Sequence, residues 1–293
     1  MIPVTVGICA YNEAGNIERS VRSLYSQRTD GISIEEVIVV SSGSTDGTDS
    51  IVRRLLPEYG NLSLLCQERR EGKNSAINLL LDSKSTEIVV LLNADNAFGS
   101  ENSLRELLAP FRDPRTGITG GHPVPTNDPR ELVGFASHMV WSMHHHTSMV
   151  FPKIGELVAF RDIGTRLPVD SQSDEDMLRM ELERNGYISA YSPDAVILNR
   201  GPDTVQDFVK QRTRVNIGER YMKKNFDYDI PTWNYGLLAR AALGMIRDLG
   251  PHPFKIAFAA SLEIVSRGRA SFYVSSNRGD MSVWDPVGTT KRL

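Results

Sequence analysis

The 293-residue sequence predicts an α/β fold with a mostly parallel central sheet, helices on both faces and a helical C-terminal tail. Two observations support this prediction. In the first hundred residues, continuous apolar runs alternate with segments of helical spacing, which is typical of parallel sheets covered by helices on both faces. Past Trp233, two helical stretches are separated by the breaker segment Gly250-Pro251-His252-Pro253.

The predicted elements follow one another in a simple order. Apolar, strand-like runs cover residues 4–10, 36–40, 62–66 and 87–92, and helical spacing covers 12–27, 49–56 and 74–81. Beyond Gly121 the pattern is less regular, and we expect a strand over 155–160 and helices over 129–150, 174–185, 205–221, 238–249 and 254–265. We therefore divide the chain into a globular domain of residues 1–232 and a tail of residues 233–293.

The charge of the chain is unevenly distributed. From Gly236 onward eight basic residues stand against four acidic ones, so the tail carries +4 and, since the whole chain carries −3, the remainder carries −7. Such a tail favours an anionic partner, for example a membrane surface. Two compatible interpretations of the tail remain. The tail lies at a membrane interface, or its helices pack on the domain and bury Leu238, Ile246, Phe254 and Phe258.

The cellular location is predicted from what the sequence lacks. We find no apolar window near the ~20 residues that cross a bilayer and no secretory signal. Cys9 and Cys66 lie in strand-like runs, which predicts buried, reduced thiols. We expect a cytoplasmic protein, free or attached to the cytoplasmic face of the membrane.

Polar loops follow three of the predicted strands. They are Ala10-Tyr11-Asn12-Glu13, Ser41-Ser42-Gly43-Ser44 and Asn93-Ala94-Asp95-Asn96. In open α/β sheets the ligand site lies beyond the carboxyl ends of the strands, so these loops should converge on one site.

Taken in order, these loops and several later segments resemble family 2 glycosyltransferases, which have the GT-A fold. The matching segments are 10–13, 39–48, 70–78, 93–95, 155–157, 175–176 and 211–215, within a resemblance from about residue 3 to about residue 218. The resemblance implies a hexosyltransferase that moves a sugar from a GDP- or UDP-sugar to an acceptor hydroxyl. The acceptor would be a glycan or a lipid-linked molecule, and we expect no nucleic-acid partner.

The resemblance also implies a donor site built around a divalent cation. Asp95 is the candidate ligand for Mn²⁺ or Mg²⁺, and Asn93 would help through its amide oxygen or a water. Lys73 opens a helix, where backbone amides and the helix dipole favour an anion such as the diphosphate. The other donor-binding candidates are Ala10, Tyr11, Glu13, Ser41, Ser42, Ala94, Gln211 and Arg214.

The acceptor hydroxyl needs a base. Asp176 is the first candidate because it opens a helix within the run Asp174-Glu175-Asp176, although the spacing does not exclude Asp174. Neighbouring carboxylates would raise one pKa toward a useful value. Together with the family resemblance, a single base implies inversion at the sugar carbon. Gly155, Glu156 and Leu157 are the acceptor-side candidates.

Some positions depart from the family pattern. Many relatives have aspartate at Ser41 or Ser42, and Asn93 replaces the first aspartate of the Asp-x-Asp motif. Val215 replaces a tryptophan, which argues against a processive polymerase. These departures leave open a second hypothesis, a nucleotide-sugar-binding protein that has lost catalysis.

Two further features of the sequence need an interpretation. His144, His145 and His146 are consecutive on a predicted helix, about 100° apart, so they cannot face one metal ion. A surface or acceptor-groove role is expected for them. Arg212 lies on another face of its helix than Gln211 and Arg214, and we interpret it as a surface residue.

Overall fold

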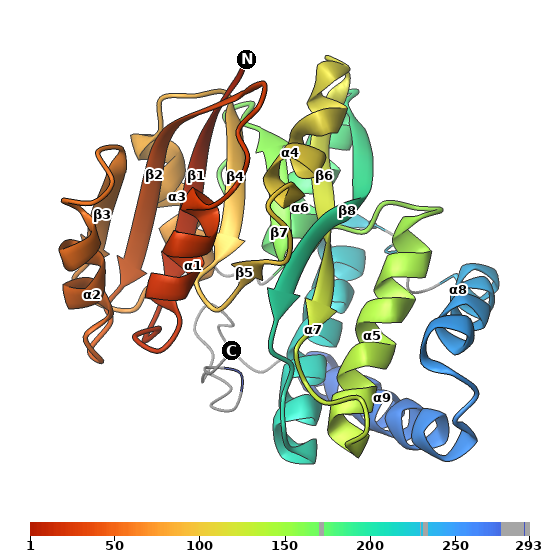
Figure 1. Cartoon of the computed structure of the whole chain (residues 1–293). Coiled ribbons are helices and arrows are strands. Elements are labelled where there is room, and N and C mark those ends of the chain that lie inside the picture. The colour runs from red at the N-terminus through yellow and green to blue at the C-terminus, as the bar shows by residue number, and fades with distance from the viewer. Residues whose placement is uncertain (170–172, 229, 231–233, 277–289, 291–293) are drawn as a thin grey trace.

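The computed structural model describes residues 1–169, 173–228, 230, 234–276 and 290, and it confirms the α/β fold (Figure 1). Within these residues one eight-stranded sheet has the order β3-β2-β1-β4-β7-β6-β8-β5. The strands are β1 (Ile2–Ala10), β2 (Ile32–Ser42), β3 (Leu62–Gln67), β4 (Ile88–Asn93), β5 (Ala97–Phe98), β6 (Thr116–Pro125), β7 (Leu157–Arg161) and β8 (Ile188–Asn199). The helices are α1 (Ile17–Tyr25), α2 (Thr48–Leu55), α3 (Lys73–Ser83), α4 (Ser103–Leu108), α5 (Leu132–Ser148), α6 (Asp174–Arg184), α7 (Val205–Phe226), α8 (Tyr235–Leu249) and α9 (Pro253–Ser275), with a short 3₁₀ helix at Ala109–Arg112.

Strands β3, β2, β1 and β4 form the parallel part of the sheet. The continuous apolar runs of β2, β1 and β4 are buried on both faces, whereas β3, at the edge, is only partly buried. In β2, Val37 and Val39 belong to the core on one face, while Ile38 and Val40 belong to the core on the other. The first core includes residues of α1 and α2 and the second includes residues of α3 and α6, so each face has its own layer of helices.

The register brings the three predicted loops to one edge of the sheet. Ala10 at the end of β1 is the partner of Ser41 in β2, and Cys9 is the partner of Asn93 at the end of β4. Because the strands are parallel, the loops that follow them leave the sheet side by side. The predicted convergence of these loops is therefore confirmed.

The second half of the sheet contains the predicted strand β7 and three strands, β5, β6 and β8, that the sequence pattern did not predict. β7 runs antiparallel between β4 and β6, and β6 pairs in parallel with the long strand β8. β6 contains three glycines and two prolines, so it lacks an apolar pattern. One glycine is required by packing, since a Cβ on Gly121 would lie 2.8 Å from the carbonyl oxygen of Ala195 in β8.

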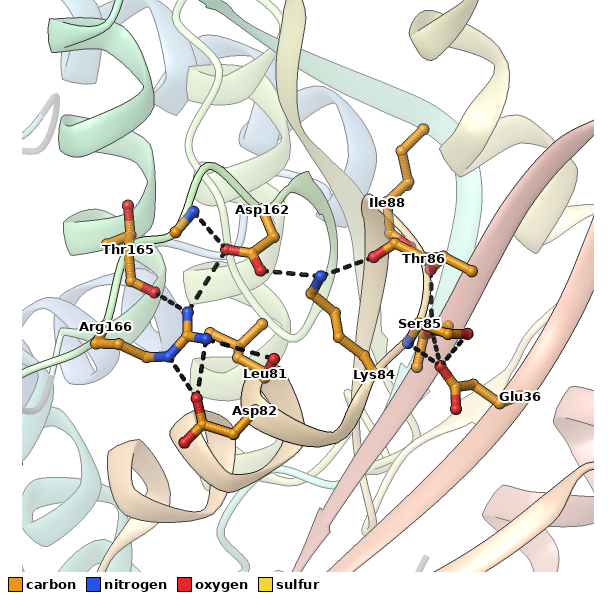
Figure 2. Close-up of polar contacts among 12 residues, drawn as sticks. Glu36, Leu81, Asp82, Lys84, Ser85, Thr86, Ile88, Asp162, Thr165 and Arg166 are labelled. Carbon is orange, nitrogen blue, oxygen red and sulfur yellow. Dashed lines mark hydrogen bonds and ion pairs between the residues drawn. The ribbon is translucent and has the colours of Figure 1, made fainter.

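A polar network fixes the loop that follows β7 (Figure 2). The Lys84 ammonium lies 2.9 Å from the buried carboxylate of Asp162, and Arg166 contacts both Asp162 and Asp82. Asn78 of α3 donates to the carbonyl of Leu167 and accepts from its amide, each at 2.8 Å. The loop leading toward α6 is thus held against α3.

The tail helices pack on the domain. α8 and α9 contact α5, and α9 also contacts α7, around a third apolar core that includes Phe135, Phe208, Met245 and Leu262. Leu238 and Phe258 are partly buried, as predicted, but Ile246 and Phe254 are exposed, so the prediction that they are buried is wrong. The proposed boundary between residues 232 and 233 lies outside the described residues. None of the helices described here combines the length and apolar character that a bilayer crossing requires.

The two cysteines are free thiols, but they differ in exposure. Cys9 is partly buried, and burial raises the pKa of its thiol to about 12. Cys66 is exposed because it lies on β3, the edge strand, so the prediction of a buried thiol is wrong there.

Candidate functional site

A cavity of about 670 Å³ lies at the edge of the sheet where the three loops emerge. Most of the predicted site residues line it. They are Ala10, Tyr11, Ser42, Lys73, Asn93, Gly155, Glu156, Asp174, Glu175, Asp176, Gln211 and Arg214. Segments far apart in the sequence therefore meet around one space.

Five predicted residues do not line this cavity. Glu13, Ser41, Ala94 and Leu157 are buried, and Asp95 is partly buried on the loop after β4. The Ser41 hydroxyl donates to Ser44 Oγ at 2.9 Å, and Glu13 Oε2 accepts from the Asn16 amide at 2.9 Å. These side chains hold the loops in shape, and their contact with a donor stays a prediction.

The first two loops are tied to each other by hydrogen bonds. Asn12, with φ of 53°, accepts from the Thr45 amide through Oδ1 at 2.8 Å and donates its own amide to Ser44 Oγ. Next to them the Arg70 guanidinium lies over the Tyr11 ring, 4.1 Å from its centroid. An aromatic ring and a cation thus line one end of the cavity.

The acidic run at the start of α6 faces Lys73 at the start of α3. Lys73 Nζ lies 2.6 Å from Asp174 Oδ2 and 3.2 Å from Glu175 Oε1. Burial, reinforced by Glu175, raises the pKa of Asp174. Burial acts the same way on Glu175, but Lys73 and hydrogen bonds from Asp174 and the backbone together lower the pKa of that carboxyl. Lys73 therefore pairs with acids in this structure, and its contact with a diphosphate stays a prediction.

Asp176 has a different environment from its neighbours. Burial raises the pKa of Asp176 to about 6; Lys153 opposes the shift, and Glu219 and Glu175 add to it. Its Oδ1 is buried and has no hydrogen-bond partner among the described residues. A carboxylate with these properties is mostly ionised at neutral pH and has an oxygen available for a proton.

Glu156 links the acceptor-side motif to the loop after β4. β7 pairs antiparallel with β4, with Leu157 opposite Leu92, so Glu156 lies beside Asn93. Glu156 has a left-handed backbone, with φ of 62°, and its Oε2 accepts from the amides of Asn93 and Asn96 at 2.8 and 2.9 Å. A left-handed conformation is unusual for glutamate, and the two amides hold it there.

The residues near Asp95 can contribute oxygen ligands to a divalent cation, but not a complete set. Among the described residues, no group of three or more His, Cys, Asp or Glu side chains is arranged to hold a metal. Asp95 and the Asn93 amide oxygen supply the oxygen donors that Mn²⁺ and Mg²⁺ prefer. These two side chains therefore fit part of a site for such a cation, and the cation site itself stays a prediction.

Helix α7 lines the far side of the cavity, and part of this wall was not predicted. Gln211, Arg212, Val215 and Glu219 line the cavity from α7. Arg212 pairs with Glu263 of α9 at 2.8 Å, so its interpretation as a surface residue is wrong. The spacing of Gln211, Val215 and Glu219, four residues apart, was the signal in the sequence that they share a helix face.

Two ionisable residues on this side were also missed. Lys153 precedes β7 and pairs with Glu219 at 3.0 Å, and both side chains are largely buried. No motif marks either residue, because the pair joins segments 66 residues apart.

The three consecutive histidines point in different directions, as predicted. His144 lines the cavity. His145 Nδ1 lies 2.8 Å from the Tyr191 hydroxyl, and His146 Nε2 lies 2.6 Å from Asp248 of α8. Only His144 therefore remains as a groove candidate.

Comparisons with known proteins agree with this geometry. Residues 5–168 match the sequence model of glycosyl transferase family 2. The structure is similar to the mannosyltransferase PcManGT from Pyrobaculum calidifontis in complex with GDP-Man and Mn²⁺, with 25% identity, a TM-score of 0.60, and coverage of 93% of this chain and 78% of that chain. The fold also resembles Staphylococcus aureus TarS in complex with UDP-GlcNAc, at 15% identity and a TM-score of 0.53, over 94% of this chain and 92% of that chain.

Curated relatives also match by sequence, among them the following two. Glycosyltransferase AglE of Haloferax volcanii is 38% identical over 92 residues, which is 31% of this chain and 30% of the relative. Poly-beta-1,6-N-acetyl-D-glucosamine synthase of Staphylococcus aureus is 23% identical over 224 residues, which is 72% of this chain and 53% of the relative. The chain thus spans about half the length, or less, of these curated relatives.

Proposed function

Because the chain belongs to glycosyl transferase family 2, we propose that it transfers a hexose from a nucleotide-diphosphate sugar to an acceptor hydroxyl, with inversion at the sugar carbon and with a divalent cation. The observation that carries the proposal is the cavity itself. It brings the loops after β1, β2 and β4 together with the acidic run of α6, which supports a donor site and a base that border one space.

We infer a GDP-sugar as the donor, with a UDP-sugar as the second candidate. PcManGT, the more similar of the two solved structures, is named with GDP-Man, whereas TarS, named with UDP-GlcNAc, is less similar. In our proposal the nucleotide lies against Tyr11 and Arg70, and its diphosphate lies toward the start of α3. The exposed amides of that helix end favour an anion there.

The proposed cation site consists of Asp95, assisted by Asn93. A bound Mn²⁺ or Mg²⁺ would neutralise the charge that develops on the leaving diphosphate. This chain supplies one carboxylate and one amide oxygen there, which supports a site that is complete only when the donor is bound. Lys73 and Arg214 are proposed to add positive charge to the leaving group.

Asp176 is proposed as the base. The acceptor oxygen bonds to the anomeric carbon on the face opposite the diphosphate, and its proton passes to the Asp176 carboxylate. The bond from the carbon to the phosphate oxygen breaks, and its electron pair leaves with the nucleoside diphosphate. The pKa of about 6 supports this role, because the base is then ionised at neutral pH but still basic enough to accept a proton.

The second hypothesis, a binding protein without catalysis, is less well supported. Ser41 and Asn93 motivate it. Against it, Asp174, Glu175 and Asp176 all line the cavity, and Asp176 has the raised pKa that catalytic carboxylates often have.

The test combines binding and transfer. Thermal unfolding is followed with GDP, UDP and their sugars, with and without Mn²⁺, for the wild type, Asp95→Ala and the exposed-residue control Asp30→Ala. We expect one nucleotide to raise the Tm in a manganese-dependent manner in the wild type and the control, and not in Asp95→Ala. If no nucleotide changes the Tm, the proposed donor site is refuted. Donor hydrolysis or transfer that persists in Asp176→Asn would refute the proposed base, and a retained anomeric configuration would refute inversion.

A further inference from the structure

A buried ion pair lies in the wall of the cavity that also contains Asp176. The Lys153 ammonium lies 3.0 Å from Glu219 Oε1, and the two side chains are only 14% and 4% exposed. Both residues line the cavity together with Asp176. Removing two charges from water costs about as much as their attraction returns, so a buried pair adds little stability compared with apolar residues of similar size. Stability alone therefore gives no reason for a charged pair at this position.

The backbone of Lys153 is held in place from two sides. Ser148 Oγ, at the end of α5, accepts a hydrogen bond from the Lys153 amide and donates one to the Lys153 carbonyl, each at 3.3 Å. A Cβ on Gly120 of β6 would lie 3.2 Å from the same carbonyl oxygen, so the strand passes close to it. The Lys153 side chain therefore starts from a backbone with little freedom, as is required of a charge that acts on a defined point.

The segment that carries Lys153 packs directly on α6. The centroid of the Phe151 ring, two residues before Lys153, lies 4.3 Å from the guanidinium carbon of Arg179. Arg179 is buried and follows Asp176 by three residues on α6, so the two side chains share one face of this helix. The contact between Phe151 and Arg179 thus places the lysine segment against the face of α6 that carries Asp176.

Glu219 reaches the same region from α7. Met222, three residues after Glu219, belongs to the same apolar core as Met177, which follows Asp176 directly in the chain. Glu219 itself lies on the side of α7 that lines the cavity. The negative member of the pair therefore approaches Asp176 from α7, and the positive member approaches it from the segment before β7.

The charged and titratable groups that face Asp176 come from three segments of the chain. They are Glu175 and Arg179 of α6, Lys153, Glu219 of α7, and Tyr228, which follows α7; His144 of α5 faces Lys153 in turn. Glu175 pairs with Lys73, and Arg179 pairs with Glu183. Burial raises the pKa of Asp176 to about 6, Lys153 opposes this rise, and Glu219 adds to it. The two charges of the pair thus act on Asp176 in opposite directions, and each limits the effect of the other.

We propose that Lys153 and Glu219 are positioning residues for the base, and that their buried pair fixes the pH range over which Asp176 accepts the proton of the acceptor. This role depends on the proposed function, in which that proton passes from the acceptor hydroxyl to the Asp176 carboxylate. Lys153 and Glu219 keep their own charges throughout and need no contact with the reacting atoms. Because the pair is neutral as a whole, Asp176 is ionised at neutral pH and remains basic enough to accept the proton.

The carboxyl carbon of Asp176 reports the effect without any activity measurement. Its ¹³C chemical shift is followed against pH in aspartate-labelled protein, and its signal is assigned by its loss in Asp176→Asn. Lys153→Met removes the positive charge and keeps Glu219, so it should raise the pKa of Asp176 by about one pH unit. Glu219→Gln keeps the charge of Lys153 and should lower the pKa of Asp176 by about one pH unit. The double variant Lys153→Met/Glu219→Gln removes both charges, so its Asp176 pKa should lie close to that of the wild type.

Lys223→Met is the matched control, because it removes an exposed lysine of α7 whose partner Asp227 is 91% exposed. This control should leave the pKa of Asp176 unchanged. The proposal would be overturned by an equal change in the control, or by single variants that move the pKa in the same direction or not at all. A double variant that departs from the wild type as far as Lys153→Met would overturn it too. If Lys153→Met does not fold, Glu219→Gln and the double variant provide the same test.

The pH profile of kcat extends the test to sugar transfer. Its acidic limb should move to higher pH in Lys153→Met and to lower pH in Glu219→Gln, whereas a purely structural role would lower kcat at every pH without moving the limb. A limb that stays in place in both variants would overturn the proposal. Absence of nucleotide binding and of transfer in the wild type would instead refute the proposed function, and the ¹³C measurement would still decide whether the pair acts on Asp176.

Discussion

Replacing Asp176 by asparagine should stop sugar transfer and at the same time stabilise the fold. Burial raises the pKa of Asp176 from 3.8 to about 6, with Lys153 opposing and Glu219 adding to the shift. Each pKa unit corresponds to about 1.4 kcal/mol, so ionisation of this carboxylate costs the folded state up to about 3 kcal/mol at neutral pH. Asparagine has the same shape without the charge. We expect a gain of about 1–3 kcal/mol and a loss of about 10²–10⁴-fold in kcat.

The pH dependence of stability distinguishes this explanation from a general effect of the substitution. Between about pH 4 and pH 6 the folded wild type retains a proton at Asp176 that the unfolded chain has released. The wild type therefore loses stability from this group as the pH rises through that window, and the loss is complete above about pH 6. The stability difference between Asp176→Asn and wild type should grow from pH 4 to pH 6 and then remain constant.

Thermal and urea unfolding across this pH range, with Asp30→Asn as the exposed control, give the measurement. An Asp176→Asn variant that is less stable than wild type at pH 7, or a stability difference that does not vary with pH, would refute the reasoning.

Three further substitutions test parts of the framework. Asn78→Ala removes both hydrogen bonds to the loop after β7 and should cost about 1–3 kcal/mol in urea unfolding. It should also lower kcat more than it raises the KM for the donor, and an unchanged kcat would contradict a role of Asn78 in positioning α6. Lys84→Met leaves the Asp162 carboxylate with the Gly164 amide at 2.9 Å but with Arg166, at 3.7 Å, as its remaining cationic contact, and should cost about 3 kcal/mol in urea unfolding; a neutral effect would mean that the pair is dispensable. In Gly43→Ala the new Cβ would lie 2.5 Å from the backbone of the neighbouring loop, at a residue whose φ is 67°. The control is Gly31→Ala, because Gly31 has a similar φ of 81° but open space around it. Nucleotide titration should show weaker nucleotide binding by Gly43→Ala than by Gly31→Ala. Equal nucleotide binding by these two glycine variants would contradict the close approach.

The parallel half of the sheet could be predicted because burial on both faces leaves a strong pattern in the sequence. Val37-Ile38-Val39-Val40 is apolar at every position, since alternate residues enter different cores. The loops after such strands must lie at one edge, so the convergence of the three polar loops followed directly from the strand assignments.

The second half could not be predicted in the same way. β6 carries glycines and prolines because its backbone passes close to β8 at Gly121, and this requirement is a tertiary one. The positions of the tail helices were predicted correctly, but which of their apolar residues are exposed was not. Phe254 lies on the outer face of α9 although it is apolar, and periodicity alone does not say which of two apolar faces is covered.

The ionic pairs of the site were the least predictable feature. The family motif places Lys73 near a diphosphate, whereas in the structure it pairs with Asp174, 101 positions along the chain. Arg212 and Lys153 likewise find their partners on other elements. Such pairs depend on how helices pack, and no local spacing encodes them.

The antiparallel pairing of β7 with β4 has a consequence for how such a protein can vary. The strand that ends at Asn93 and the strand that follows Glu156 are hydrogen-bonded neighbours in the sheet. The offset between these two strand ends is therefore the distance between adjacent strands, roughly 5 Å. The segment between them includes β5 and β6, which belong to the same sheet, and the helices α4 and α5, and its loops do not alter that offset. Insertions or replacements in these loops can therefore reshape the surroundings of the cavity while the two strand ends keep their separation.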